Sequence, residues 1–206
     1  MSLLNAMLGS PIKLEISGRA TPIRGLLIDV GPDIIVVNDG SKYLYLPILH
    51  IQKLEEDDSS ESVTSEGEVE QLFDHTEISY RKTVMNAKGV FTEVCITGTQ
   101  SLHGYITSIM NEYFVFFSPV HRTVYVSLQH VKIIIPYAPD QTPYYLNRER
   151  FPLQPPSITL ARTFEQQMKK LVGELVALDL GDNPGKIGLL KSMDNQLVEL
   201  IGPDGR

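Results

Sequence analysis

Short apolar runs separated by turn residues dominate the chain. Representative runs are Leu26–Val30, Ile34–Val37 and Val131–Ile135, which have the length of strands and are rich in β-branched residues. Glycine, proline and aspartate divide the runs, as at Gly31-Pro32 and Asp39-Gly40. This alternation predicts a mostly β protein built from short strands joined by turns.

The runs recur in the same order about eighty residues later. Residues 8–16 are answered by 88–96, residues 23–28 by 102–107, and residues 45–51 by 125–131. A third copy begins near residue 171, without the segment that closes the other two. We expect an unpaired β-edge there, which is a template for a strand from elsewhere. The residues that define the repeat are Gly9, Gly25, Tyr45, His50, Gly89, Gly104, Tyr125, His130, Gly173 and Gly188.

The middle glycine of each copy suggests the shape of the repeated unit. Gly25, Gly104 and Gly188 lie inside strand patterns, where glycine commonly marks a sharp bend. A short helix is expected before each copy, most clearly over residues 163–171. A short helix followed by a strongly bent sheet is typical of SH3-like and Sm-like barrels. We therefore expect tandem small barrels of this kind.

Two segments of distinct composition separate the copies. Residues 55–78 hold ten acidic residues and no basic one, so they should form a self-repelling tether, or alternatively a docking or phosphorylation segment. Residues 136–160 are rich in proline and tyrosine and should be stiff, with Tyr144 and Tyr145 as candidate contacts. The expected organisation is a first β-module (1–54), an acidic linker (55–78), a second β-module (79–135), a Pro/Tyr-rich linker (136–160) and an incomplete third β-module (161–206).

Charge and chemistry narrow the function. The net charge of −7 lies essentially in the acidic linker. No apolar run has the length of a membrane span, and the N-terminus does not have the pattern of a signal peptide. The single cysteine, Cys95, is flanked by apolar residues and is expected in the core, while His50 and His130 recur and are expected to be structural. We therefore expect a protein that is not an enzyme and has no cofactor, metal site or small-molecule substrate.

Protein contact is the leading expectation and nucleic-acid binding is the alternative. The run 113–117 is expected to be a buried or interface strand, with Tyr113, Phe114, Phe116 and Phe117 as candidate interaction residues. The second copy is mildly basic and aromatic, as a nucleic-acid-binding Sm-like barrel would be, but the adjacent acidic linker should repel phosphates. A regulatory adaptor whose acidic linker is the active element is a third hypothesis.

The repeat resembles the spore coat protein B family and related tandem-module spore coat proteins. The resemblance implies a structural component of the spore coat, assembled in the mother-cell cytoplasm and held by contacts with other coat proteins and with itself. The Ser/Lys/Arg-rich tail of coat protein B does not occur in this sequence, and the third copy is incomplete. The matching residues are Gly9, Gly25, Val36, Tyr45, His50 and Ile51, then Gly89, Gly104, Val115, Tyr125, His130 and Val131, and finally Gly173 and Gly188.

Overall fold

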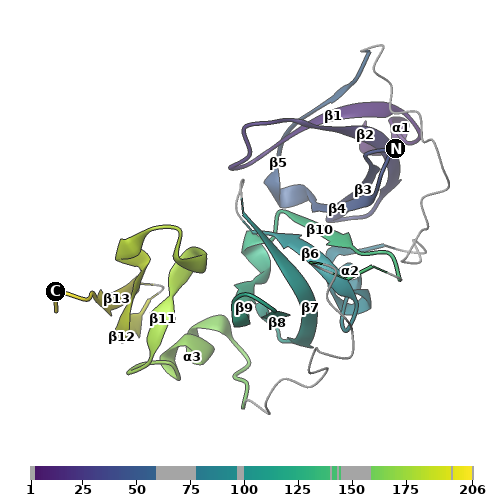
Figure 1. Ribbon diagram of the computed structural model, residues 1–206. Helices are drawn as coiled ribbons and strands as arrows, with labels where there is room; N and C mark the ends of the chain where they lie inside the picture. Colours follow the sequence, from purple (N-terminus) through teal and green to yellow (C-terminus); the bar gives the residue numbers. More distant parts are fainter. Residues whose placement is uncertain are drawn as a thin grey trace.

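The computed structural model describes residues 3–58, 78–96, 100–139, 141–142, 144, 159–195 and 197–205. Within these residues the protein is mostly β, and every pairing between its strands is antiparallel. The predicted class is therefore confirmed. Figure 1 shows three β-rich units that follow one another along the chain.

Each unit begins with a short helix, followed by strands. The first module comprises α1 (Leu3–Ala6), β1 (Pro11–Ile16), β2 (Ile23–Val30), β3 (Ile34–Asn38), β4 (Tyr43–Pro47), the 3-10 helix η1 (Ile48–His50) and β5 (Ile51–Glu56). The second comprises α2 (Tyr80–Asn86), β6 (Phe91–Cys95), β7 (Ser101–Ile109), β8 (Tyr113–Ser118), β9 (Arg122–Ser127), η2 (Leu128–His130) and β10 (Ile133–Pro136). The third comprises α3 (Phe164–Lys169), β11 (Leu175–Ala177), the 3-10 turns η5 (Leu178–Gly181) and η6 (Pro184–Lys186), β12 (Ile187–Asp194) and β13 (Leu197–Ile201).

The first two modules share one ten-stranded sheet. Its order is β5-β1-β2-β3-β4-β10-β6-β7-β8-β9, and the third module has a separate sheet of order β11-β12-β13. Separate closed barrels are therefore not what the described residues form, because β4 of the first module pairs with β10 of the second rather than with β5 of its own module. The local strand pattern does not specify which edge a strand will join.

A close approach between strands recurs in all three modules. Ile12 lies opposite Gly25, Thr92 opposite Gly104, and Val176 opposite Gly188. A methyl group on any of these glycines would overlap the backbone carbonyl of the third strand, at Asn38, Phe117 or Ile201. The second strand of each module then carries a bulge, at Leu27/Asp29, Ile106/Ser108 and Leu190/Ser192. Glycine therefore lets the second strand bend sharply against the third.

The first module extends into the segment that composition assigns to the acidic linker. β5 extends to Glu56, two residues beyond the expected end of the first module. Glu55 lies opposite Lys13 of β1, and the two side chains form an ion pair of 3.2 Å. Glu55, which has a basic partner on the neighbouring strand, therefore belongs to the first module.

The core crosses the boundary between the first two modules. Ile133 and Ile135 of β10 and Cys95 of β6 pack into the core of the first module, beside residues such as Leu27 and Leu46. Conversely, Ile34, Val36 and Tyr45 of the first module pack with the core of the second. The two modules are therefore joined by shared hydrophobic packing as well as by the β4–β10 pairing.

Candidate assembly surface

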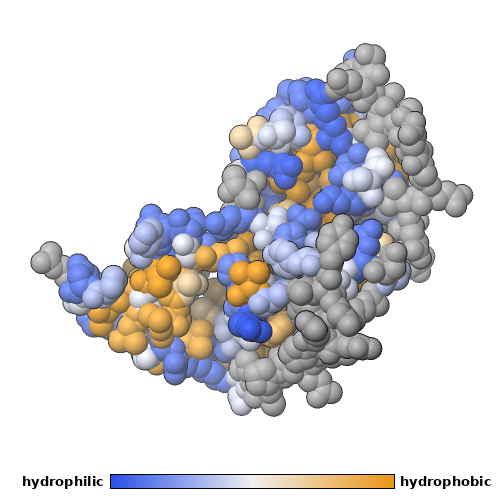
Figure 2. Space-filling model, viewed as in Figure 1, coloured by the Kyte–Doolittle hydropathy of each residue, from blue (hydrophilic) through white to orange (hydrophobic). Residues whose placement is uncertain are grey.

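The third module exposes several apolar side chains of its sheet, although Leu190 and Met193 of β12 are buried. Leu175 and Leu197 are 75% and 76% exposed, and Ile187, Leu189 and Val198 are exposed as well. Figure 2 shows this area as a broad hydrophobic patch over β11, β12 and β13. We call four of them, Leu175, Ile187, Leu189 and Leu197, the exposed apolar sheet, because the registers place these four on one face, whereas Val198 lies on the other face opposite Met193. Burying one leucine is worth about 1.5–3 kcal/mol, so a patch of this kind marks a contact surface.

The equivalent strands of the other modules are buried. The registers place Leu197 where the first module has Ile34 and the second has Tyr113, and both of those side chains are fully buried. All five residues of β3 and all six of β8 are buried, whereas Leu197, Val198 and Glu199 of β13 are exposed. Leu197 and Val198 are thus suited to covered positions that the described chain leaves open, whereas Glu199, which stands where the first module has Val36, forms an ion pair with Lys191.

Among the described residues, neither side of the small sheet has the neighbouring strand that the other modules have. β3 pairs with β4 and β8 pairs with β9, whereas β13 pairs with β12 alone among the described residues. At the opposite edge, the first strand of each module is compared. β1 pairs with β5 and β6 pairs with β10, whereas β11 pairs with β12 alone among the residues that the structure describes. Both edges therefore present backbone N–H and C=O groups that can accept a further strand.

A repeated contact seats each helix on the preceding module. The backbone N–H of Tyr80, the first residue of α2, donates to Oδ1 of Asp33 at 2.7 Å. The backbone N–H of Phe164, the first residue of α3, donates to Oε2 of Glu112 at 3.0 Å. A carboxylate at a helix N-terminus satisfies an unpaired donor and complements the helix dipole. The same device therefore joins the second module to the first and the third to the second.

Tyr113 carries the contact between the second and third modules. Its hydroxyl donates to the backbone carbonyl of Ala161 at 2.7 Å and lies 3.1 Å from Oε1 of Gln167. Gln167 is buried and also accepts from the backbone N–H of Ala161, while the ring of Phe164 packs edge-on against Tyr113. The third module is therefore held by a buried polar network beneath α3.

A cluster of polar side chains lies at the boundary of the first two modules. The ammonium of Lys132 lies 3.0 Å from Nδ1 of His50 and donates to Oγ of Ser17 at 2.6 Å. Burial and, next, the positive charge of Lys132 lower the pKa of His50, although the backbone of Gln129 opposes them. Burial also lowers the pKa of Lys132. The arrangement therefore favours the neutral form of His50.

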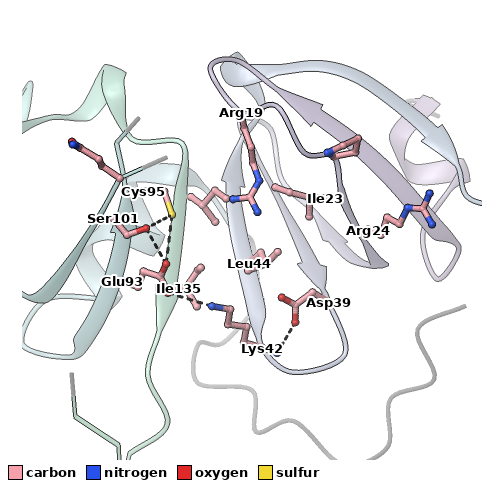
Figure 3. A pocket seen from close by; sticks show the side chains of 13 residues that line it. Arg19, Ile23, Arg24, Asp39, Lys42, Leu44, Glu93, Cys95, Ser101 and Ile135 are labelled. Atoms are coloured by element: carbon pink, nitrogen blue, oxygen red, sulfur yellow. Dashed lines mark hydrogen bonds and ion pairs between the residues drawn. The ribbon is translucent and has the colours of Figure 1, made fainter. Parts of the chain in front are cut away.

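A cavity of about 280 Å³ opens at the same boundary (Figure 3). Within it, Ser101 donates to Glu93 at 3.0 Å and its Oγ lies 3.1 Å from the sulfur of Cys95, while Lys42 forms an ion pair with Glu93 at 3.2 Å. Burial, the largest effect, raises the pKa of the Cys95 thiol. A thiol held in its protonated form is a weak nucleophile, so this geometry favours a structural role for the cysteine.

The predicted aromatic strand lies inside the protein. Tyr113, Phe114, Phe116 and Phe117 are all buried, in the core of the second module and its contact with the third. They are therefore not an exposed contact surface in this structure, because β8 is flanked by β7 and β9. Of the predicted linker tyrosines, Tyr144 is exposed and its ring packs edge-on against His103, and Tyr145 lies outside the described residues.

The repeated residues differ in burial from copy to copy. Tyr45 is fully buried and Tyr125 is partly buried, while His50 is buried and His130 is exposed. The difference follows from position, since His50 faces Lys132 of the next module. Gly9, Gly89 and Gly173 agree more closely, because each has a positive φ and donates its N–H to the second strand of its own module, at Leu27, Ile106 and Leu190 respectively.

The exposed apolar sheet could not be recognised from hydrophobicity alone. Leu175, Leu189 and Leu197 have the same strand pattern as buried residues elsewhere in the chain. The residues described for the third copy include no counterpart of β4 or β5, so its strands lack these neighbours there.

None of the described helices is long and apolar enough to cross a bilayer.

The described residues thus form tandem β-modules, the third of which carries an exposed apolar sheet whose two edges are open within this part of the chain. Residues 163–206 match the family model named YwrJ third domain. The chain is 42% identical to the uncharacterized protein YwrJ of Bacillus subtilis (strain 168), over 213 aligned residues that cover 100% of this chain and 93% of that protein. The chain therefore belongs to the YwrJ family.

Proposed function

We propose that the protein is a non-enzymatic assembly protein of the bacterial spore coat, which acts by contact with other coat proteins and with itself. The observation that carries the proposal is the exposed apolar sheet of the third module. It is matched in sequence to strands that are covered in the other two modules, and it remains uncovered here. Such a surface is suited to a protein partner.

The coat assignment is supported by the repeat. Glycine, tyrosine and histidine follow one another in the first two copies in the order that resembles coat protein B. The relationship to a Bacillus subtilis protein is compatible with this assignment. We further propose that each module is a variant of the SH3-like or Sm-like architecture, since the bent second strand and the preceding short helix occur in all three.

Binding of nucleic acid by tandem Sm-like modules is the second candidate. It is favoured by the basic side chains of the second module. However, Arg81 donates to the backbone carbonyl of Met110 at 2.6 Å, and Lys132 is held by His50 and Ser17. These two cations are therefore already engaged. Phosphate recognition would need a continuous basic groove, so we rank this candidate below assembly.

The location of a fluorescent fusion in a sporulating Bacillus that carries this gene tests the proposed function. We expect the signal to form a ring around the developing spore, because coat proteins accumulate there. Diffuse fluorescence would contradict the coat assignment. Fluorescence that coincides with a DNA stain would favour the nucleic-acid candidate instead.

A further inference from the structure

β10 shows how one strand joins two modules. It lies between β4 of the first module and β6 of the second and is antiparallel to both. Ile134 is opposite Tyr45 on one side and Val94 on the other, and all four residues of β10 are buried. A single extended segment therefore pairs with two strand edges at once.

The corresponding place between the second and third modules holds no strand of the described residues. β9 has the place of β4 and is the last strand of the ten-stranded sheet, while β11 has the place of β6 and is an outer strand of the three-stranded sheet. The contact of Phe164 with Glu112 repeats that of Tyr80 with Asp33. This repetition indicates that β11 is oriented toward β9 as β6 is toward β4.

The turn η5 partly covers the core at this place. Leu180 packs against the core of the second module, whereas Ile133 and Ile135 of β10 cover the core of the first. Asp179 and Leu180 both have positive φ, 47° and 60°, a strained conformation for residues other than glycine. β11 also ends after three residues, whereas β1 has six and β6 has five. A strained turn thus replaces the end of the strand.

We propose that the third module binds an extended strand–turn–strand segment of a partner protein. The first strand of this segment pairs with β13, as β9 pairs with β8. Its second strand pairs with β11 and β9, as β10 pairs with β6 and β4. The inference rests on the proposed function, since it specifies how the partner is held. On binding, η5 gives up its left-handed conformation and β11 lengthens.

The chemistry expected of the partner's segment follows from the segments of this chain that complete the first and second modules. Residues 43–56 and 122–136 both consist of an apolar strand, a 3-10 turn and a second strand. Both are already paired within their own modules, which argues against a second copy of this chain as the donor. The partner therefore supplies an apolar, β-branched segment whose backbone amides are free to pair.

A synthetic peptide with the sequence of residues 43–56 tests the inference on the full chain. A fluorescein-labelled peptide is titrated and its anisotropy measured, and hydrogen exchange maps where it binds. The matched control has the same side chains but N-methylated amides at alternate residues of its strands. We expect the control to bind at least about tenfold more weakly, since its N-methylated amides cannot donate hydrogen bonds to the neighbouring strands. We also expect new protection in β9 (Arg122–Ser127), β11 (Leu175–Ala177) and β13 (Leu197–Ile201).

Equal binding of both peptides, or protection outside these strands, would overturn strand addition. The outcome is separable from that of the proposed function. If the peptide does not bind while the fusion forms its ring, the coat role stands and strand addition fails. If the peptide binds with protection of β11 and β13 while the fusion stays diffuse, strand addition stands and the coat role fails.

Discussion

Among single residues, the middle glycine of each module has the most direct structural consequence. A Cβ atom on Gly104 would overlap the carbonyl oxygen of Phe117 and crowd the ring of Phe116. Both neighbours belong to β8, which is buried along its whole length and has little room to move. The bend of β7 therefore depends on the absence of a side chain.

We predict that Gly104→Ala destabilises the protein by about 1–3 kcal/mol, the usual cost of overpacking a core. Urea denaturation of the purified protein measures the change. Gly185→Ala is the matched control, because the nearest atom there, Oδ1 of Asn183, lies 3.4 Å away and belongs to a side chain. Equal stability of the two variants would show that the close approach does not determine the fold.

His50 gives the boundary of the first two modules a pH dependence. Its pKa lies below the ordinary value of about 6.5, chiefly because the ring is buried and next because Lys132 is close. The unfolded chain therefore binds this proton more readily than the folded one. The free energy of unfolding should decrease as the pH falls from about 6.5 toward the lowered pKa of the folded state.

We predict that His50→Asn reduces this loss of stability, because asparagine can accept the hydrogen bond from Lys132 without becoming charged. The measurement is the difference between the urea midpoints at pH 5 and at pH 7.5, compared between the wild type and the variant. Carboxylates that titrate in this range contribute equally to all the proteins compared. His130→Asn is the control, since His130 holds the equivalent position but is exposed. If His50→Asn kept the pH dependence of the wild type, His50 would not be the group that causes it.

At the scale of elements, the short helices connect consecutive modules. Thr163 caps α3 by accepting from the backbone N–H of Gln166, and Ser79 caps α2 by accepting from that of Lys82. The caps fix where each helix begins, and the carboxylate of the preceding module then receives its first N–H. The helices are therefore joints between modules as well as parts of them.

We predict that Tyr113→Phe loosens the third module from the second. The substitution keeps the ring but leaves the buried carbonyl of Ala161 without this donor, at a cost of about 1–3 kcal/mol. Limited proteolysis should then release a fragment containing the third module at lower protease concentration. Tyr144→Phe, at an exposed tyrosine, should cleave like the wild type. Unchanged cleavage of Tyr113→Phe would indicate that the network does not hold the module.

The elements were largely predictable, whereas their partners were not. The periodicity over 163–171 predicts a helix, and α3 occupies Phe164–Lys169. Composition placed Glu55 and Glu56 in a linker, but the ion pair with Lys13 keeps Glu55 in β5. A run of acidic residues by itself predicts a solvent-exposed linker. Only the fold shows that a neighbouring strand supplies a basic partner for one of them.

For the whole molecule, the sequence predicted the three copies but not how they join. The pairing of Ile134 with Tyr45 links residues almost ninety positions apart, and no local pattern encodes it. For the same reason the aromatic run 113–117, a buried or interface strand by its pattern, was favoured as a contact surface, and it is core here. The exposed surface belongs instead to the third copy, where hydrophobic strands lack neighbours among the described residues.

The most direct test of the central claim, that the exposed apolar sheet holds the protein in its assembly, compares three fluorescent fusions during sporulation. They are the wild type, Leu175→Glu/Leu197→Glu, and Val120→Glu as a control at a residue of the second module that is 61% exposed. All three changes lie at exposed positions, so folding should be little affected. The account predicts a ring for the wild type and for Val120→Glu, and diffuse fluorescence at equal protein level for the double variant. A ring in the double variant would contradict it.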